Sequence, residues 1–375
     1  MPETDYELSG QGPAETVAAP ELPYRPPVPK SYRPRIGLIG CGGISESHLK
    51  AYVSQGWDVV AFCDLSEEAA VKRRDAFYPE AEVYTDWAEL LKRDDIDVID
   101  AALHPAVRAR AIEDALNAGK HVLSQKPFAI DIDTAKRLVD LADQRGLKLA
   151  VNQNGRWAPH VAYARAAVEQ GVLGELSSID LSVHWDHNWI VGTAFDAIPQ
   201  IILFDFAVHW FDMVRCYAAD RPITRAIAAD VMLKGQKARP PLGAHIMLQA
   251  DGLFATLAFN ANAPVGGVDR TLVVGSKGIL ESTGPSLGEQ TVSVQLAEGK
   301  STPDLQGTWF SEGFIGTMGE LLCAIEEDRE PGNSGAHNLH SLEITYATMA
   351  SAAKGGQPVD VGSVSSIDPS WLTYD

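Results

Sequence analysis

The chain of 375 residues has few cysteines, few basic residues and no long apolar run, and each shortage excludes a class of protein. Its four cysteines (Cys41, Cys63, Cys216 and Cys323) lie far apart without a C-x-x-C pair, which favours reduced thiols over a disulfide framework or a zinc site. The formal net charge of −19 disfavours nucleic acid as a partner, because phosphate binding needs a positive surface. No apolar stretch reaches the roughly 20 residues that span a bilayer, so we expect no membrane partner.

The N-terminal stretch is acidic and rich in proline. Residues 1–20 lack a basic segment followed by an apolar one, so we expect no secretory signal and a cytoplasmic location. Proline fixes φ and removes an amide donor, so residues 1–34, which include Pro26, Pro27 and Pro29, are expected to form an extended arm. The alternatives are a disordered tail and an arm that lies across a neighbouring surface, such as another subunit.

From residue 35 to residue 152, apolar strand patterns alternate with helical ones. This alternation predicts an α/β domain with a Rossmann-type, doubly wound parallel sheet. The expected strands are 36–39, 59–63, 98–103, 121–124 and 147–151, and the expected helices are 44–55, 67–77, 106–118 and 132–145.

Residues 153–375 are expected to form a second, α+β domain for substrate binding and oligomerisation. Few helices separate its strands, so its open sheet should be largely antiparallel. Because an open sheet commonly finds a partner, we expect a homodimer or homotetramer. The expected strands are 176–185, 225–233, 244–248, 254–259, 271–274 and 291–296, and the expected helices are 159–169, 201–217, 316–327 and 339–353.

The first strand runs into a glycine-rich turn of the form G-x-G-x-x-S at residues 40–45. Gly40 would make the tight turn, and Gly42 would let backbone amides approach a pyrophosphate at the N-terminus of the next helix. Strand, turn and helix follow in the order that a dinucleotide site requires. The sequence therefore predicts cofactor binding by Gly40, Gly42, Gly43 and Ile44.

Asp64 ends the second strand, 24 residues after Gly40. An acid there can accept both hydroxyls of the adenine ribose and repel a 2′-phosphate, so we expect NAD, with NADP as the alternative. The other interpretation of Asp64 is a capping or turn aspartate beside Ser66 and Glu67. The basic residues 72–74 are expected to form a solvated helix face.

Two segments carry candidate catalytic residues. Lys126 follows a buried strand and precedes Pro127, at the edge where open α/β sheets place their ligands; the alternative is a solvent lysine on a turn. Asp205, His209 and Asp212 stand at i, i+4 and i+7 of an otherwise apolar helix, hence on one face. A neighbouring carboxylate can orient an imidazole as a proton acceptor, whereas the alternative is a core histidine with a capping aspartate.

Together, these segments resemble the glucose–fructose oxidoreductase and inositol dehydrogenase family (Gfo/Idh/MocA) over about residues 33–360. The likeness rests on GCGGI with His48, on AGKHV leading to Lys126-Pro127, on NGRW at 154–157, on D-x3-H-x2-D, and on GSKG at 275–278. It implies an NAD(P)-dependent oxidoreductase that transfers a hydride between nicotinamide and a hydroxyl or carbonyl of a sugar, cyclitol or glycoside.

The resemblance also implies roles for single residues. Lys126 would contact the reacting hydroxyl and the nicotinamide ribose, and His209 would accept the proton in alcohol oxidation or donate it in carbonyl reduction. Asp205 would position His209 or the substrate, and His104 and Pro127 fall in the cofactor site. The chain departs from the family in that Gln125 replaces a glutamate, His104-Pro105 replaces T-P, and Arg108 stands where histidine is common.

Residues 184–189 follow the first strand of the second domain and combine aromatic faces with polar groups, which suits a sugar ring. The alternative is a packed loop, and a metal site here is weakly supported, so we expect no metal. The candidate substrate residues are His184, Asp186, His187, Arg156, Trp157 and Asp212, with Trp309 and Phe310 as weaker ones.

Other functions stay open at this point. Within the same class, the chain is expected to act alternatively as a keto-sugar reductase or as an enzyme that cleaves glycosides through a transient ketone. From another class, it would be a dinucleotide-binding regulator or scaffold without turnover.

Overall fold

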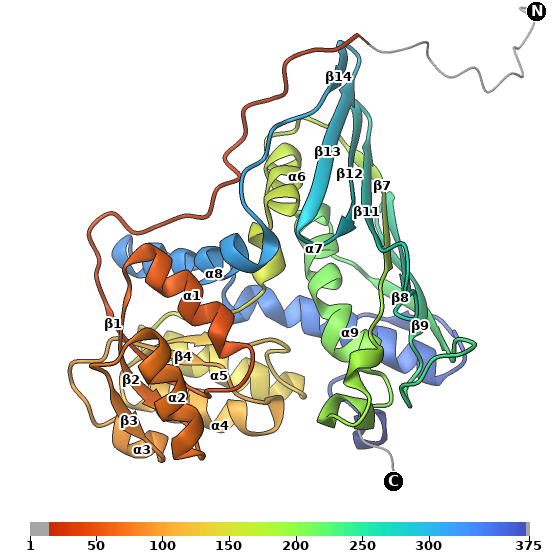
Figure 1. Ribbon diagram of the computed structural model, residues 1–375. Helices are drawn as coiled ribbons and strands as arrows, with labels where there is room; N and C mark the ends of the chain where they lie inside the picture. Colours follow the sequence, from red (N-terminus) through yellow and green to blue (C-terminus); the bar gives the residue numbers. More distant parts are fainter. Residues whose placement is uncertain (1–14, 373–375) are drawn as a thin grey trace, which may run out of the picture.

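A computed structural model describes residues 15–372, so the first 14 residues of the expected arm lie outside the described residues. The chain forms two sheets. In Figure 1 the smaller sheet lies at the lower left and the larger one at the right, with helices between them.

The smaller sheet is the predicted Rossmann sheet, with six parallel strands in the order β3-β2-β1-β4-β5-β6. The expected strands and helices are all present, to within a few residues at their ends. The structure adds β3 and α3, which are too short and too polar to leave an apolar pattern. The elements are β1 (Arg35–Ile39), α1 (Ser45–Gln55), β2 (Asp58–Cys63), α2 (Glu67–Phe77), β3 (Glu82–Tyr84), α3 (Trp87–Leu90), β4 (Val98–Ala101), α4 (Pro105–Asn117), β5 (His121–Ser124), α5 (Ile132–Gln144) and β6 (Leu149–Val151).

Local chemistry sets the ends of these helices. The Ser66 hydroxyl accepts from the Ala69 amide and caps α2, and the Asp131 carboxylate caps α5. Gly119 and Gly146 follow α4 and α5 with φ of 76° and 65°, the left-handed conformation that ends a helix and favours glycine.

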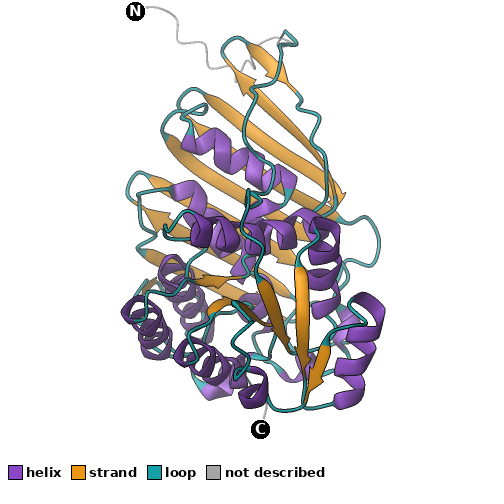
Figure 2. Ribbon diagram, turned by 90° about the vertical axis from the view of Figure 1, so that its left-hand side faces the viewer, coloured by secondary structure: helices purple, strands orange, loops and turns teal. Residues whose placement is uncertain are grey.

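The larger sheet has nine strands in the order β14-β13-β12-β11-β7-β10-β9-β8-β15, antiparallel except for the parallel pair of β7 and β10. It is the predicted open sheet. Helices α6, α7 and α9 contact its strands, and Figure 2 shows helices over one face of its strands. The elements are α6 (Pro159–Glu169), β7 (Leu176–His184), α7 (Val208–Ala218), β8 (Arg225–Val231), β9 (Gly243–Ala250), β10 (Leu253–Asn260), β11 (Val268–Gly275), β12 (Gly278–Ser286), β13 (Glu289–Leu296), β14 (Gly299–Ser301), α8 (Trp309–Glu326), α9 (Gly335–Ala353) and β15 (Val359–Asp360).

The expected continuous helix over residues 201–217 is wrong. A π-helical turn at Ile202–Phe206, in which the Ala207 amide donates to the Ile202 carbonyl, precedes α7. The wider turn changes the phase between the residues before it and those after it, and Asp205 lies inside it while His209 and Asp212 lie in α7. Such turns are frequent at functional sites.

The arm lies along its own chain from residue 15 onward, so a disordered tail is wrong for this part. The Val17 amide donates to the Lys300 carbonyl beside β14, and the Tyr163 hydroxyl of α6 donates to the Pro20 carbonyl. At the other end, the Glu326 carboxylate of α8 accepts from the amides of residues 30–32. Figure 1 shows this course from the tip of the large sheet to β1.

Helix α8 packs beside α1, so a segment late in the chain joins the core of the first domain. Phe314, Met318 and Leu322 belong to the same buried cluster as Leu38 and Tyr52. None of the helices within residues 15–372 combines the length and the apolar character needed to cross a membrane.

Candidate active site

The glycine-rich turn between β1 and α1 has the shape of a dinucleotide cradle. Gly40 has φ of 100°, and a Cβ there would lie 2.5 Å from the Ala102 carbonyl oxygen, so only glycine fits. At Gly42 and Gly43 a Cβ would meet no atom within 4 Å, which leaves open space at the N-terminus of α1. The open approach and the free helix terminus both suit a pyrophosphate, so these residues fit NAD.

Asp64 lies beside this turn at the end of β2. Its Oδ2 accepts from the Cys41 amide at 2.8 Å and its Oδ1 accepts from the Ser66 amide at 2.9 Å. The carboxylate therefore stabilises the turn before α2, as the capping alternative expected. It also stands next to the glycine-rich turn, where the ribose interpretation requires it.

The expected solvated face at residues 72–74 is wrong for Arg73. Its guanidinium reaches back to the glycine-rich turn, where it donates to the Gly42 carbonyl at 3.2 Å and pairs with Glu46 at 2.8 Å. Hydrogen bonds from Lys50 and Arg73 lower the pKa of Glu46 to about 2. The i, i+3 spacing from Ala70, the buried residue of α2, offered the signal that was missed.

The Asp64→Ser substitution should weaken NAD binding about 10- to 100-fold, since it removes charged hydrogen bonds worth about 1.5–3 kcal/mol to the ribose hydroxyls. NADP binding should improve, because the repelling charge is gone while Arg73 remains nearby. Titration of both cofactors measures the effect. Asp75→Ser, on the exposed side of α2, is the matched control. Unchanged NAD affinity in Asp64→Ser would contradict the ribose role.

Lys126 and Asp205 meet across the two domains. The Lys126 ammonium donates to the Asp205 backbone carbonyl at 2.7 Å and to Asp205 Oδ1 at 2.9 Å. Asp205 lies within the π-helical turn, and Lys126 follows β5 by two residues. Burial acts to raise the pKa of Asp205, but the charge and hydrogen bond of Lys126 hold it below the usual value. The Asp205 carboxylate thus fixes Lys126, whereas the sequence suggested that it would orient the imidazole of His209.

His209 lies in the first turn of α7, close enough to Lys126 and Asp205 for their charges to act on it. Burial and the nearby ammonium lower its pKa to about 3, against the opposing effect of Asp205. Its ring stands edge-on to Trp309 at 5.8 Å, and its Nδ1 has no hydrogen-bond partner among the described residues. The imidazole is therefore neutral near pH 7.

Arg156 and Asp212, predicted as substrate residues, bind each other instead. The guanidinium donates to both Asp212 oxygens at 2.6 and 2.7 Å, and the Ser341 hydroxyl adds a third hydrogen bond at 2.7 Å. Arg156 is 4% exposed and Asp212 is fully buried. Trp157 is also buried, against Gly316 of α8.

The loop after β7 divides its predicted residues between different places. His184 alternates with the buried Val183, so its ring lies on the opposite face of the sheet, where it bonds Ser182. Asp186 is exposed and holds the Asn188 amide at 3.0 Å. His187 alone is within reach of the charges of Lys126 and Asp205.

His104 follows β4 in the turn before α4, and Arg108 lies in the first turn of α4. His104 caps α4, since its Nδ1 accepts from the Ala106 amide at 3.4 Å. The buried Arg108 donates to the carbonyls of Leu103 and Pro127 and thereby links this turn to the Lys126-Pro127 turn. The departure from the family histidine at 108 thus acquires a structural role.

Gln125 connects Lys126 to a buried polar network. Its Oε1 accepts from the Lys126 amide at 2.7 Å, and its amide nitrogen lies 3.4 Å from His48 Nε2. His48 Nδ1 lies 2.7 Å from Asp100 Oδ2, and the Asn152 side-chain nitrogen lies 3.0 Å from Nε2. Because Asp100 takes the proton on Nδ1, Nε2 is an acceptor that suits the two amides.

Restoring the family residue with Gln125→Glu should lower kcat/KM about 10-fold at pH 8, because an acceptor oxygen then faces the lone pair of His48 Nε2. Steady-state kinetics measure this, with Gln144→Glu on the surface as control. An unchanged kcat/KM in Gln125→Glu would refute the assigned tautomer.

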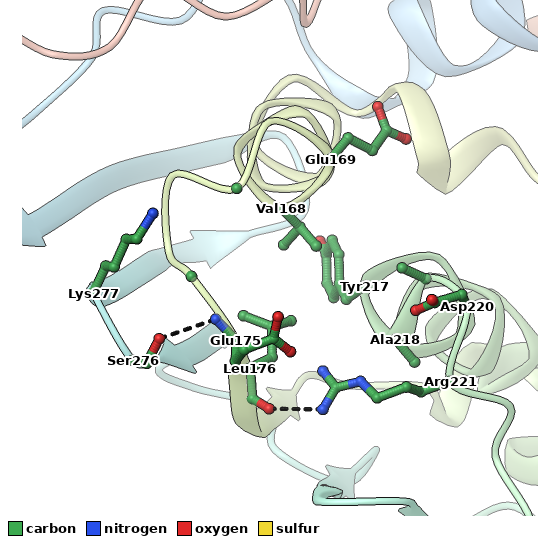
Figure 3. Close-up of a pocket in the computed structure, with 13 residues that line it drawn as sticks. Val168, Glu169, Glu175, Leu176, Tyr217, Ala218, Asp220, Arg221, Ser276 and Lys277 are labelled. Carbon is green, nitrogen blue, oxygen red and sulfur yellow. Dashed lines mark hydrogen bonds between the residues drawn. The ribbon is translucent and has the colours of Figure 1, made fainter.

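A pocket of about 370 Å³ lies at the C-terminal ends of α6 and α7 (Figure 3). Tyr217, Arg221 and Lys277 line it, and Arg221 donates to the Leu176 carbonyl at 2.9 Å. Its lining includes none of Lys126, Asp205 and His209. Over residues 15–372, no group of three or more His, Cys, Asp or Glu side chains is placed to hold a metal ion.

Comparisons with known proteins agree with this geometry. The family model "Oxidoreductase family, NAD-binding Rossmann fold" (GFO_IDH_MocA) matches residues 34–153, and "GFO/IDH/MocA C-terminal domain" matches residues 161–281. The D-apiose dehydrogenase of Paraburkholderia graminis is 25% identical over 336 residues, which cover 85% of this chain and 87% of that protein. The inositol 2-dehydrogenase of Rhizobium meliloti is 28% identical over 337 residues, which cover 86% and 98%.

Among solved structures, the scyllo-inositol dehydrogenase of Lactobacillus casei, with bound NAD(H) and scyllo-inositol, matches with a TM-score of 0.76. It is 23% identical, and the match covers 88% of this chain and all of that one. Fold, glycine-rich turn and both family models lead to one assignment. The chain belongs to the GFO/IDH/MocA family of oxidoreductases, and its first domain is an NAD-binding Rossmann domain.

Proposed function

We propose that the protein is an NAD-dependent dehydrogenase that oxidises a secondary or anomeric hydroxyl of a monosaccharide, cyclitol or glycoside. The observation that carries this proposal is the pairing of Lys126 with Asp205 beside a neutral His209. These three groups stand where the carboxyl end of the Rossmann sheet meets the second domain, which is the usual ligand edge of such a sheet.

NAD supplies the hydride acceptor when it is bound by the glycine-rich turn and Asp64. The ammonium of Lys126 is held by its two hydrogen bonds to Asp205. It donates a further hydrogen bond to the alcohol oxygen and favours loss of the alcohol proton. Neutral His209 takes that proton, while the electron pair of the carbinol C–H bond leaves as hydride and the C=O bond forms. In the reverse direction, the same groups deliver a proton to a keto sugar.

The substrate class rests on two supports. The named relatives act on apiose and inositol, which are small polyols. The cleft of this chain also holds aromatic side chains near its polar groups: Trp185 stacks on Phe206 at 4.0 Å, and Trp189 is 61% exposed. Rings beside hydrogen-bonding groups suit the apolar faces and hydroxyls of a sugar.

The test is a panel of sugars, cyclitols and glycosides incubated with the protein and NAD, followed by the absorbance of reduced nicotinamide. We expect turnover with at least one polyol, and its loss in the His209→Asn variant. The same panel of keto sugars with NADH tests the reductase alternative, and product analysis tests glycoside cleavage. Binding of NAD without turnover of any compound would favour the regulator.

Three further expectations belong to this proposal. Residues 35–152 and residues 153–375 would form the two domains, and residues 1–34 would form the arm. The more exposed face of the nine-stranded sheet, which includes Ser178 and His184, would form the interface of a homodimer or homotetramer. The four cysteines are unpaired, as expected of a protein in the cytoplasm.

A further inference from the structure

We propose that His187 is a specificity-determining residue whose Nε2–H group donates a hydrogen bond to an acceptor oxygen of the substrate. This inference rests on the proposed function, because it assigns a role within the same cleft. It differs from a second catalytic base, since a fixed donor recognises the substrate without taking its proton.

Two indole groups determine the tautomer of His187. The Trp185 Nε1–H donates to His187 Nδ1 at 3.0 Å, and the Trp189 Nε1–H donates to the same atom at 3.2 Å. Indole nitrogens only donate, so Nδ1 must carry a lone pair. The neutral ring therefore bears its proton on Nε2, and protonation of Nδ1 would break both hydrogen bonds.

The surroundings of the ring hold this state and orient it. The His187 backbone amide donates to the Ala261 carbonyl at 2.8 Å, and the ring is enclosed by Trp185, Trp189 and Phe206 at centroid distances of 5.0–5.7 Å. His187 is only 9% exposed. Burial lowers its pKa to about 4, with Asp205 and Asp186 opposing and Lys126 assisting.

The free atom of this ring is Nε2. It makes no hydrogen bond to any residue between 15 and 372, in contrast to Nδ1, which has two. The ring packs on Phe206, the neighbour of Asp205, and shares the electrostatic environment of Lys126. An N–H in a largely buried ring gains most from an oxygen with lone pairs, such as a sugar hydroxyl, ether or carbonyl oxygen. A substrate lacking that oxygen leaves the donor unpaired and is rejected.

The first experiment compares His187→Phe with His187→Gln, using the polyol found in the panel. Phenylalanine keeps a ring without the donor, and glutamine keeps a donor without the ring. We expect the KM for the polyol to rise at least 10-fold in His187→Phe and less in His187→Gln, with kcat and NAD affinity nearly unchanged. A KM within twofold of the parent in His187→Phe, or a fall in kcat alone, would overturn the proposal.

The second experiment removes the indole donors and keeps the rings. In the Trp185→Phe/Trp189→Phe variant the proton can move to Nδ1, so the ¹⁵N chemical shifts of His187 should change from a single Nε2–H tautomer to a mixture. KM should then rise, because only part of the protein presents an Nε2–H group to the substrate. A mixture of tautomers in the parent would refute the inference. Because the ¹⁵N measurement needs no turnover, it separates failure of the inference from failure of the proposed function.

Discussion

The Lys126→Met variant should lose about 10³- to 10⁴-fold in kcat/KM and keep its fold. The ammonium donates to the backbone carbonyl and to one carboxylate oxygen of Asp205, and it is placed to polarise the reacting hydroxyl. Removing a charged donor of this kind commonly costs two to three orders of magnitude, and the loss of the cation beside Asp205 adds to it. Methionine retains most of the length of the lysine side chain, so the loss reports on the charge.

The controls for this variant separate charge from packing. Lys136→Met removes an exposed lysine of α5 and should leave kcat/KM unchanged. Asp205→Asn keeps a side-chain oxygen for Lys126 and removes the negative charge, so it should cost less than Lys126→Met. Steady-state kinetics with a melting curve for each variant measure these effects. A Lys126→Met enzyme with more than a tenth of the parental kcat/KM would show that Lys126 does not polarise the reacting hydroxyl.

The fold could be predicted from the sequence because its elements are periodic and well separated. Each long strand of the Rossmann sheet is an apolar run between turn residues, and each main helix carries its own cap or glycine stop. Strand β12 was missed because it contains Gly284 and Pro285, which interrupt the pattern of alternating residues. The order of strands follows from the alternation of strand and helix.

The site could be predicted only in part, because spacing assumes an unbroken helix. The π-helical turn at Ile202–Phe206 leaves no mark in the apolar pattern, and spacing does not show that Asp205 meets Lys126 while Asp212 meets Arg156. Contacts between distant segments were equally hidden. The spacing of Arg73 from Ala70 indicates a side chain that faces the domain but not its contact with Gly42, and nothing local to Arg108 indicates that it holds the Pro127 carbonyl.

The sequence predicted His187 as a site residue but not its tautomer. The sequence placed an imidazole among aromatic residues, but composition alone could not say which nitrogen carries the proton. That depends on two indole donors converging on one atom, which is a property of the folded loop. Electrostatic roles therefore required the structure even where the residue itself was foreseen.

The Asp212→Ala variant should lower the free energy of unfolding by about 3–5 kcal/mol, because it leaves the buried Arg156 guanidinium without a counter-charge. The double variant Arg156→Met/Asp212→Leu should recover much of this loss, since neither charge is then buried. Denaturant unfolding of the two single variants and the double variant measures the coupling. Asp360→Ala, which breaks the exposed pair with Arg225, is the control and should change stability little.

The same variants decide between the two roles of this pair. If the pair is structural, the free energy of unfolding changes by a large and coupled amount, and the loss of activity follows the fraction of protein that is unfolded. A substrate-binding pair predicts the reverse, with parental stability and a raised KM in Asp212→Ala. We expect the first result, because both oxygens of Asp212 are already occupied by Arg156 and Ser341 and none of the three side chains reaches solvent appreciably.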